Sequence, residues 1–351
     1  MTSNVENRVR EARVGRGWTQ AALARRARVS RAEVAAIEGN RLVPSVATAL
    51  ALAEALGLSV EKLFAPRGQR IGQPAWAWPP TGEPCRYWRA HVDDRLLLYP
   101  VESDAVGELA HDGLFAGERY SERSERSPQE TLVLACCDPA ARLLAAEYAR
   151  QTGYRMIVFV RSSGRALELL AQGLVHVAGT HLATEDRPEG NVVRVRSLVR
   201  KPYRLVRVAR WQEGIAVGSG VSARSVGGVL RSRLRWVGRE PGSGARQCLD
   251  ELFSARRAPQ RIARTHQAVV EAVQSGWADA GICVRLSSEE AGLRFLPVRE
   301  EFYELCFPVE REGDPRLQAL LRVLRSAAFR RCLGELPGYD VSEMGDMGTV
   351  G

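Results

Sequence analysis

Lysine is nearly absent from this chain, and long hydrophobic runs are missing altogether. Only Lys62 and Lys201 are lysines among 50 basic residues, so arginine carries almost all of the net charge of +9. No apolar run is long enough to cross a bilayer, which excludes a membrane-spanning protein and predicts a soluble one. A chain of 351 residues with 45% hydrophobic content is sufficient for two or three domains with buried cores, and its basic charge agrees with a nucleic-acid partner.

Catalytic and metal-binding signatures are missing as well. The sequence has no GxxxxGK phosphate loop, no HExxH, no GxSxG elbow, and no Ser, His and Asp set at a recognisable spacing. Seven cysteines stand at positions 85, 136, 137, 248, 283, 306 and 332 without any CxxC pair, and we expect most of them to be reduced and buried. These absences predict a binding protein, not an enzyme, with no metal and no cofactor. No secretory signal precedes the first helical pattern, which predicts a cytoplasmic location.

Residues 8–64 have the pattern of a small helical domain that reads DNA. Apolar residues recur at helical spacing through residues 9–14, Thr19 caps a second helix, and Ser30 caps a third after a turn at residues 27–29. Val34 and Ile37 supply the buried side of the third helix. The residues expected to face outward from its N-terminal half, where base edges are reached, are Ser30, Arg31, Glu33 and Ala35.

The segment TQAALARRARVSRAEVAAIEGNRLVPS resembles the lambda-repressor and Cro-like helix-turn-helix family, also called the XRE family. The resemblance implies that Gln20 braces the DNA backbone and that Arg41 contacts a phosphate. It also implies that Ser30, Arg31 and Glu33 address phosphates and bases. Arg28 belongs to a basic cluster at the turn, and residues 1–64 hold ten basic against six acidic residues, a net of +4. Such charge supplies the salt-dependent part of DNA affinity. The alternative is a helical bundle that docks another protein.

A Pro- and Gly-rich stretch without periodicity follows, and it predicts a linker over residues 66–84. Within it, Trp76 and Trp78 are expected to pack against a domain. From residue 85 onward, short apolar runs alternate with helical stretches, which predicts an α/β domain with a parallel sheet. YWRAHV and RLLLYPV are expected to pair as strands. TLVLACC and YRMIVFVRS are expected strands that precede the helices AARLLAAEYARQTG and RALELLAQG, respectively.

Small and polar residues stand where several of these strands lead into helices. Backbone N–H groups and the positive end of a helix bind an oxyanion, Ser adds donors, and Gly permits close approach. The residues in such positions are Ser162, Ser163, Gly164, Ser243, Gly244 and Ala245. Two such junctions in one α/β segment predict an anion-binding cleft.

The stretch from about Leu132 to Tyr339 resembles periplasmic-binding-protein-like (type II) domains of the molybdate-binding type. Among the matching segments are VGREPGSGARQCLDELF and THQAVVEAVQSGWADAGICV. The resemblance implies a multidomain protein with an all-α helix-turn-helix head at residues 1–65 and a two-lobed α/β domain at residues 85–351. Lobe one would hold about residues 85–206 and 294–345, and lobe two about residues 207–293. We expect the chain after Tyr339 to be mobile.

The resemblance also implies which residues surround the ligand between the lobes. They are Cys137, Asp138, Ser162, Ser163, Thr180, His181, Ser243, Gly244, Ala245, Arg246, Thr265 and Tyr303, with His266, Asp279 and Glu301 at further matching positions. Plainer interpretations stay open: a buried structural role for His181 and His266, a capping role for Asp279, and an ion pair for Arg246. The family pattern is broken at Cys136, His176 and Gly238, which leaves the ligand open. Cys136 and Cys137 also allow a thiol sensor or a soft-metal site.

Together the two halves predict a one-component transcription regulator. We expect it to bind operator DNA as a homodimer and to respond to a small ligand, either molybdate, tungstate or a related oxyanion, or an organic metabolite. A cleft domain that only holds a dimer together is the remaining alternative.

Overall fold

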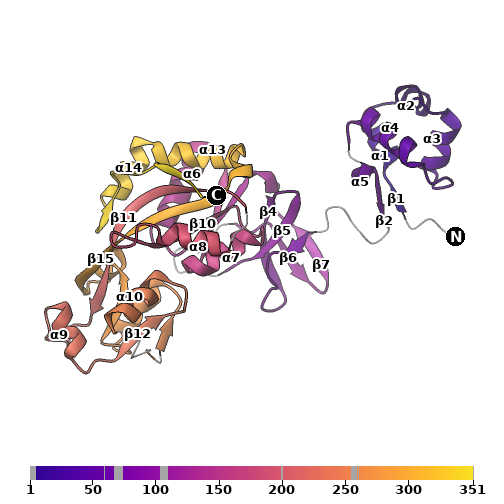
Figure 1. Cartoon of the computed structure of the whole chain (residues 1–351). Helices are drawn as coiled ribbons and strands as arrows, with labels where there is room; N and C mark the ends of the chain where they lie inside the picture. The colour runs from indigo at the N-terminus through magenta and orange to yellow at the C-terminus, as the bar shows by residue number, and fades with distance from the viewer. Residues whose placement is uncertain are drawn as a thin grey trace. The chain divides into compact units, whose positions relative to one another are not determined.

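The computed structural model describes residues 5–58, 60–66, 74–102, 110–198, 201–253, 259 and 261–350. The chain forms two compact units, Met1–Ala75 and Trp76–Gly351 (Figure 1). Among the described residues, no helix combines the length and the apolarity needed to cross a bilayer.

The first unit is a bundle of short helices. They are α1 (Val9–Val14), α2 (Gln20–Ala27), α3 (Arg31–Glu38), α4 (Val46–Leu56) and α5 (Val60–Leu63). The hydroxyls of Thr19, Ser30 and Ser45 accept hydrogen bonds from N–H groups in the first turns of α2, α3 and α4, as N-caps do. Leu23, Val34 and Ile37 are fully buried at its centre. The predicted helix limits around the turn are confirmed.

Two strands also belong to this unit, so the all-α expectation is incomplete. β1 (Val5–Asn7) pairs antiparallel with β2 (Phe64–Pro66) and joins the two ends of the bundle. Strands of three residues are too short to show an alternating pattern in the sequence.

The second unit begins with a separate antiparallel sheet. Its strands, in the spatial order β3-β5-β4-β6-β7, are β3 (Ala75–Trp76), β4 (Cys85–Val92), β5 (Arg95–Pro100), β6 (Gly113–Ala116) and β7 (Arg119–Glu122). The expected pairing of β4 with β5 is present. Trp76 packs edge-to-face on Phe115, and Trp78 packs on Phe159 with ring centroids 4.7 Å apart. Aromatic anchoring agrees with the placement of residues 76–84 in the second unit, although the sequence predicts a linker there.

The large sheet has ten strands and runs through both lobes. Its main path has the order β13-β12-β14-β11-β15-β10-β8-β9, and β16 and β17 pair with β11. The strands are β8 (Thr131–Cys136), β9 (Arg155–Val160), β10 (Val177–Thr184), β11 (Tyr203–Val217), β12 (Trp236–Arg239), β13 (Arg261–Ala263), β14 (Ala280–Val284), β15 (Arg294–Pro308), β16 (Tyr339–Asp340) and β17 (Met347–Val350). β11 and β15 pair antiparallel to each other and to their neighbours, so the sheet is mixed and not parallel throughout.

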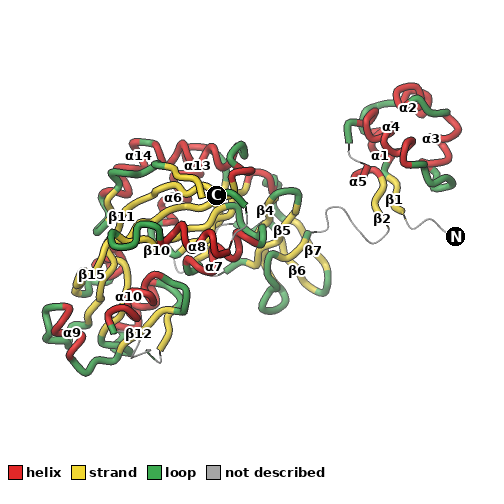
Figure 2. The backbone as a smooth tube through the Cα atoms, in the orientation of Figure 1, coloured by secondary structure: helices red, strands yellow, loops and turns green. Residues whose placement is uncertain are grey.

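Helices cover both faces of the sheet in each lobe, and Figure 2 shows this arrangement for lobe one. In lobe one, α6 (Ala141–Thr152), α13 (Pro315–Arg325) and α14 (Ala327–Gly334) share one buried cluster, whereas α7 (Ser163–Ala171) and α8 (Gly190–Leu198) pack on the other face with the small sheet. In lobe two, α9 (Val226–Arg231) and α10 (Gly244–Leu252) cover one face and α11 (His266–Gln274) the other. The remaining short helices are α12 (Arg285–Glu290) and the 3₁₀ turns Pro128–Glu130 and Val309–Arg311.

The two lobes are joined by β11 and β15, each 15 residues long. The second half of β11, from Glu213 to Val217, pairs with β14 and with the first residues of β15. The lobe boundary therefore runs through the middle of both strands, a few residues beyond the predicted limits at 206/207 and 293/294, because one continuous strand serves both lobes. The two-lobed α/β arrangement itself is confirmed.

The C-terminal segment is ordered, which corrects the expectation of a mobile tail. β17 pairs with residues 203–206 of β11, and Met344 and Val350 are buried. A polar, Gly-containing stretch gave no sign of this pairing because only its few apolar residues enter the core.

Candidate functional site

The recognition positions of the first unit lie at the start of α3. Ser30 and Arg31 are exposed, as predicted. Glu33 is half-buried and accepts a hydrogen bond from the Thr48 hydroxyl at 3.1 Å. Ala35 is half-buried as well, so the outward-facing surface is narrower than the sequence predicts.

Gln20 fixes α2 against α3. Its Nε2 donates to Glu38 Oε2 at 2.9 Å, and Arg13 donates to both oxygens of the same carboxylate, at 2.6 and 3.0 Å. Burial would raise the pKa of Glu38, but the bonds from Arg13 and Gln20 outweigh it and hold the pKa below its usual value. The half-buried Gln20 amide thus has an internal role, and its contact with a DNA phosphate stays a prediction.

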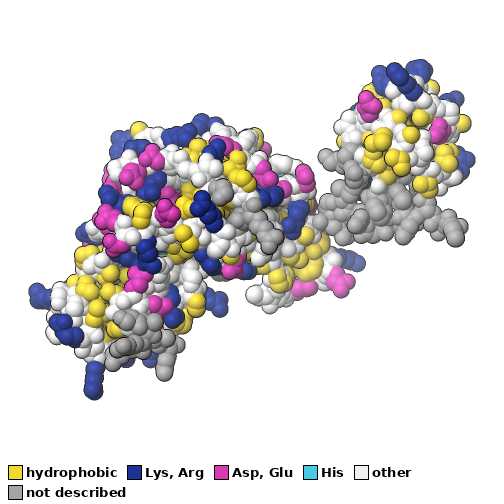
Figure 3. Space-filling model, in the orientation of Figure 1, with side chains coloured by type: hydrophobic (Ala, Val, Ile, Leu, Met, Phe, Trp, Pro, Cys, Tyr) yellow, Lys and Arg dark blue, Asp and Glu magenta, His cyan; other side chains and the backbone are white. Residues whose placement is uncertain are grey.

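Arg28 and Arg41 border the same surface. Arg28 is exposed and ends α2 in the left-handed backbone region, with φ 54° and ψ 39°. Arg41 is exposed just after α3. Exposed Arg25 and Arg26 add charge on α2, where Figure 3 shows basic side chains, and the Arg26 guanidinium lies 4.2 Å from the centre of the Trp18 ring. This arrangement agrees with a basic DNA-binding face.

In the second unit, the lobes touch at the N-terminal ends of α7 and α10. The N–H of Gly164 donates to the carbonyl of Gly242 at 3.2 Å across the boundary. Every predicted residue at these two ends is buried: Ser162, Ser163, Gly164, Ser243, Gly244 and Ala245. The two lobes are therefore in contact where the sequence predicts a cleft between them, and the binding of an anion there stays a prediction.

The imidazole of His181 lies at the centre of the closed cleft. Its Nε2 is 2.9 Å from Cys137 Sγ, and its Nδ1 is 2.5 Å from Glu301 Oε2. Trp211 Nε1 donates to the same Glu301 oxygen at 3.1 Å. Gly244 of lobe two lies against this ring, so the predicted residues Cys137, His181 and Gly244 are brought together.

A guanidinium holds two buried carboxylates beside His181. Arg299 is paired with Glu213 at 2.9 Å and with Glu301, and it donates to the carbonyl of Gly244 at 2.9 Å. Burial and the neighbouring Glu301 raise the pKa of Glu213 well above its usual value. We refer to Cys137, His181, Glu213, His266, Arg299 and Glu301 as the His181 cluster.

Two side chains of lobe two complete the surroundings. His266 follows Thr265, whose hydroxyl caps α11, and it is 2% exposed, with no hydrogen-bond partner for either ring nitrogen. Burial and the nearby Arg239 lower the pKa of His266 well below its usual value, so the ring is neutral at pH 7. Arg239 is 1% exposed; its Nη2 donates to the carbonyl of Arg264, and its Nη1 has no partner.

Three other predicted residues, Asp138, Thr180 and Tyr303, make contacts within lobe one. Asp138 accepts hydrogen bonds from the N–H of Ala140 at 2.9 Å and from the Tyr339 hydroxyl at 2.5 Å. Burial raises the pKa of Asp138 to about 6. Thr180 donates to Asn191 at 3.1 Å, and Tyr303 stacks on Trp211 with ring centroids 4.6 Å apart.

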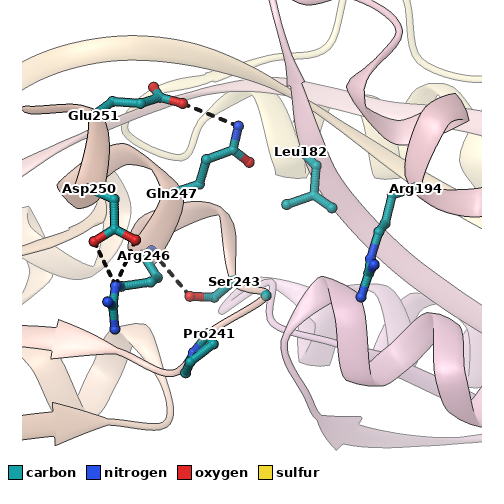
Figure 4. Close-up of a pocket in the computed structure, with 9 residues that line it drawn as sticks. Leu182, Arg194, Pro241, Ser243, Arg246, Gln247, Asp250 and Glu251 are labelled. Carbon is teal, nitrogen blue, oxygen red and sulfur yellow. Dashed lines mark hydrogen bonds and ion pairs between the residues drawn. The ribbon is translucent and has the colours of Figure 1, made fainter. Parts of the chain in front are cut away.

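Arg246 and Asp279 are engaged away from the His181 cluster. Arg246 pairs with Asp250 at 2.8 Å, and Asp279 pairs with Arg235 at 2.6 Å. Arg246 instead lines a pocket of about 520 Å³ at the mouth of the cleft, together with Arg194 and Leu182 from lobe one (Figure 4). The pocket is completed by Pro241, Gly242, Ser243, Gln247, Asp250 and Glu251.

The sequence departs from the family pattern at Cys136, His176 and Gly238, and all three residues lie outside the His181 cluster. Burial raises the pKa of Cys136 to about 12, which contradicts a reactive thiolate at that residue. His176 accepts from the N–H of Val133 and bonds to the carbonyl of His91, toward the small sheet. A β carbon on Gly238 would lie 3.0 Å from the ring of Pro259.

Sequence reasoning did not identify Arg239, Arg299, Glu213 or Trp211. Each lies on a crossing strand or at a strand end, and polar residues in otherwise apolar strands are the signal that could have found them. Glu213 and Glu301 are fully buried in strands, where an unpaired charge is costly.

A helix-turn-helix unit and a two-lobed domain with a polar cleft define a class of proteins that combine DNA binding with ligand binding. A family profile described as "PBP superfamily domain" matches residues 145–325, and one described as "Helix-turn-helix" matches residues 9–63. The chain belongs to the family of the PBP superfamily domain. The expected combination of domains is therefore confirmed, whereas a molybdate-binding type stays a prediction.

Two curated proteins and one solved structure illustrate the similarity. The chain is 29% identical over 185 residues to "Uncharacterized protein YvgK" of Bacillus subtilis, covering 50% of this chain and 59% of YvgK. It is 36% identical over 90 residues to "Uncharacterized protein in ferredoxin 2Fe-2S gene 5'region" of Clostridium pasteurianum, covering 24% of this chain and 76% of that protein. PhnD1 of Prochlorococcus marinus, in complex with methylphosphonate, is 13% identical with a TM-score of 0.44, covering 61% and 93% of the two chains.

Proposed function

We propose that the protein is a one-component transcription regulator that binds operator DNA as a homodimer through α3 and responds to a small ligand held between the two lobes. The observation that carries this proposal is the presence in one chain of a helix-turn-helix unit and a two-lobed domain whose lobes meet around buried polar side chains. A ligand that binds between lobes favours the closed form, and this difference in affinity is what shifts DNA binding.

The ligand that we propose is a small anion, with molybdate, tungstate and related oxyanions as the first candidates. The N-terminal ends of α7, α10 and α11 all border the cleft, and helix N-termini attract negative charge. Ser162 caps α7 without a side-chain capping bond, and the Arg239 guanidinium keeps one partnerless nitrogen. The negative charge of Glu301 would repel an anion next to Gly244. We therefore propose that the anion binds on the α7 side of the cleft.

A second candidate is an organic anion. The pocket of about 520 Å³ at the mouth exceeds the size of a tetrahedral oxyanion and offers Arg194 and Gln247 as donors. A carboxylated metabolite of a few carbon atoms would fill it better than molybdate.

Thermal unfolding of the full chain tests the ligand side of this proposal. The panel contains molybdate, tungstate, sulfate, phosphate and small organic acids, each in the presence and absence of DNA. A ligand at one hundred times its Kd stabilises its domain by about 2.7 kcal/mol. The shift should disappear in Ser162→Ala, or in Arg246→Ala for an organic ligand, and should remain in Ser275→Ala, an exposed control at the end of α11.

The DNA side is tested by selecting bound sequences from a random pool and footprinting them. A homodimer of this class should protect two half-sites about one helical turn apart. If no compound of the panel shifts thermal unfolding while DNA binding is normal, the result would contradict a sensing role. It would favour a cleft domain that only holds the dimer together.

A further inference from the structure

Three side chains with metal-binding donors meet inside the closed cleft. Cys137 Sγ and one ring nitrogen each of His181 and His266 lie within 4.8 Å of one another, and all three residues are buried. They come from three segments far apart in the sequence, which is why the spacing of cysteines and histidines along the chain did not indicate a site. Cys137 and His181 belong to lobe one, and His266 belongs to lobe two.

The burial of the His266 imidazole is not explained by any hydrogen bond among the described residues. Both of its ring nitrogens are buried without a hydrogen-bond partner, although a buried polar group without a partner costs about 1–3 kcal/mol. An ordinary structural histidine would donate from one nitrogen and accept at the other. The His266 ring lies near His181, with the two ring centroids 6.0 Å apart.

His181 is held in the form that a metal ligand requires. Its Nδ1 lies 2.5 Å from Glu301 Oε2, so the Nδ1 proton is donated to the carboxylate and the Nε2 lone pair points toward Cys137, whose thiol proton it accepts in the absence of metal. A carboxylate bonded to the far nitrogen of a ligating histidine is a recurrent feature of metal sites. Glu301 is itself fixed by Trp211 and Arg299.

Two other interpretations of the His181 cluster explain fewer of its contacts. His181, Glu213 and Glu301 also lie close enough to hold an ion, but both carboxylates are already paired with Arg299. Cys137, His181 and Glu301 have the order of a nucleophile, a base and an orienting group. That arrangement leaves His266 without a role, and Cys137 is only 3% exposed.

We propose that Cys137, His181 and His266 bind a Zn²⁺-class metal ion that joins lobe one to lobe two. A thiolate and two imidazoles suit borderline-soft ions, and three protein ligands leave the fourth tetrahedral position open to water or to a small anion. Tetrahedral Zn²⁺ would place its S and N ligands about 3.4–3.6 Å apart. The three donor atoms therefore have to shift on binding: Cys137 Sγ and His181 Nε2, which are 2.9 Å apart, must separate, and no hydrogen bond restrains the His266 ring.

The charge around the site can accommodate the ion. Binding releases the Cys137 thiol proton to solvent, so the thiolate and Glu301 offset part of the positive charge of the metal, Arg299 and Arg239. Arg239 opposes the ion, and it is in turn paired with Glu240 at 3.4 Å. Because the ligands come from both lobes, occupancy stabilises the closed cleft. This last consequence, and any effect on DNA affinity, rests on the function proposed above.

Cobalt substitution of the full chain, freed of metal with a chelator, tests the site. Co²⁺ should bind at one equivalent per chain with visible bands of tetrahedral geometry and a thiolate charge-transfer band, and Zn²⁺ should displace it. Cys137→Ser should abolish the charge-transfer band, and His266→Gln should weaken Co²⁺ binding at least about tenfold. The matched control is Cys136→Ala, the adjacent buried thiol, which should keep both the band and the stoichiometry.

The wild-type measurement keeps the proposal falsifiable if a variant fails to fold. X-ray absorption at the zinc edge should give one sulfur and two nitrogen ligands from protein. The proposal is overturned if the wild-type chain binds no Co²⁺, if Cys136→Ala and not Cys137→Ser loses the band, or if Cys137 reacts rapidly with iodoacetamide at a rate that Zn²⁺ does not change.

Operator binding measured with and without Zn²⁺ separates the site from the proposed function. Zn²⁺ binding without any DNA binding would support the site and contradict the regulator. DNA binding that responds to an anion in a chain that binds no Zn²⁺ would support the regulator and overturn the site. A change of operator affinity on adding Zn²⁺, lost in Cys137→Ser and kept in Cys136→Ala, would support both.

Discussion

Gly244 of lobe two lies directly against the imidazole of His181 of lobe one. A β carbon on Gly244 would be 2.6 Å from His181 Cε1 and 2.7 Å from Nδ1, closer than any tolerated contact. Because both atoms belong to a ring held by Glu301 and Cys137, the ring cannot move aside. The lobes therefore close fully only when this position lacks a side chain.

Gly244→Ala should act as a wedge between the lobes. Overpacking costs about 1–3 kcal/mol, and here the cost falls on the closed form alone, so affinity for a ligand bound between the lobes should fall roughly 5- to 150-fold. Small-angle scattering should record a larger radius of gyration. Gly220→Ala is the control, since a β carbon there meets nothing within 4 Å. Equal scattering and equal affinity for wild type and Gly244→Ala would disprove the wedge.

Arg31→Ala should weaken specific operator binding by about 1–3 kcal/mol, because an exposed arginine at the start of α3 is placed to read a base. Fluorescence anisotropy against the selected operator and a scrambled duplex measures the change. Arg10→Ala removes the same charge from the exposed surface of α1 and should leave the ratio of the two affinities unchanged. An unaltered footprint for Arg31→Ala would remove Arg31 from the base-reading residues.

Arg28→Gly should change stability and DNA binding in opposite directions. The left-handed backbone of Arg28 costs a residue with a β carbon about 1–2 kcal/mol, and glycine relieves this at about 0.5–1 kcal/mol of extra entropy in the unfolded chain. The first unit should gain roughly 0.5–1 kcal/mol in denaturant unfolding. If Arg28 contacts a phosphate, the slope of log affinity against log salt should fall by about 1. A stability gain without a change in slope would exclude the phosphate contact.

Glu38→Gln should destabilise the first unit by about 1.5–3 kcal/mol, because it removes the charged partner of Arg13 and Gln20. The pKa of Glu38 is lowered in the folded protein, so its contribution is fully present above about pH 4.5 and is lost as the pH falls further. Unfolding of wild type and variant at pH 7 and pH 3 should therefore differ most at pH 7. A gap that does not shrink on acidification would contradict the ion pair as the cause.

Periodicity and capping residues predicted the helix-turn-helix unit well. Thr19 and Ser30 mark helix starts because a hydroxyl at an N-cap satisfies a backbone N–H locally, and this signal is complete within four residues. The sequence pattern also predicted the strands β8 and β9 and the helices that follow them. β1, β2 and β17 were not, because each depends on a partner strand distant in the sequence.

The cleft was predictable in outline but not in its chemistry. The glycines and serines at the starts of α7 and α10 were found because helix entry has a local pattern. His181, Glu301 and Arg299 act through contacts between β10 and β15, and a sequence cannot specify which buried polar side chains meet across a sheet. Arg246, for which the sequence left both an anion contact and an ion pair open, is paired with Asp250 one turn along the same helix.

Lobe two is a single insertion in the chain, so β11 and β15 are its only covalent ties to lobe one. These strands carry the bulges after Arg207 and after Glu213, and they also carry Glu213, Arg299 and Glu301. The strands that connect the two lobes are thus the same strands that carry the charged side chains between the lobes. If the lobes close on a ligand as proposed, a substitution in these strands should change the affinity for the ligand and the free energy of lobe closure together, so selectivity and response should be coupled in this architecture.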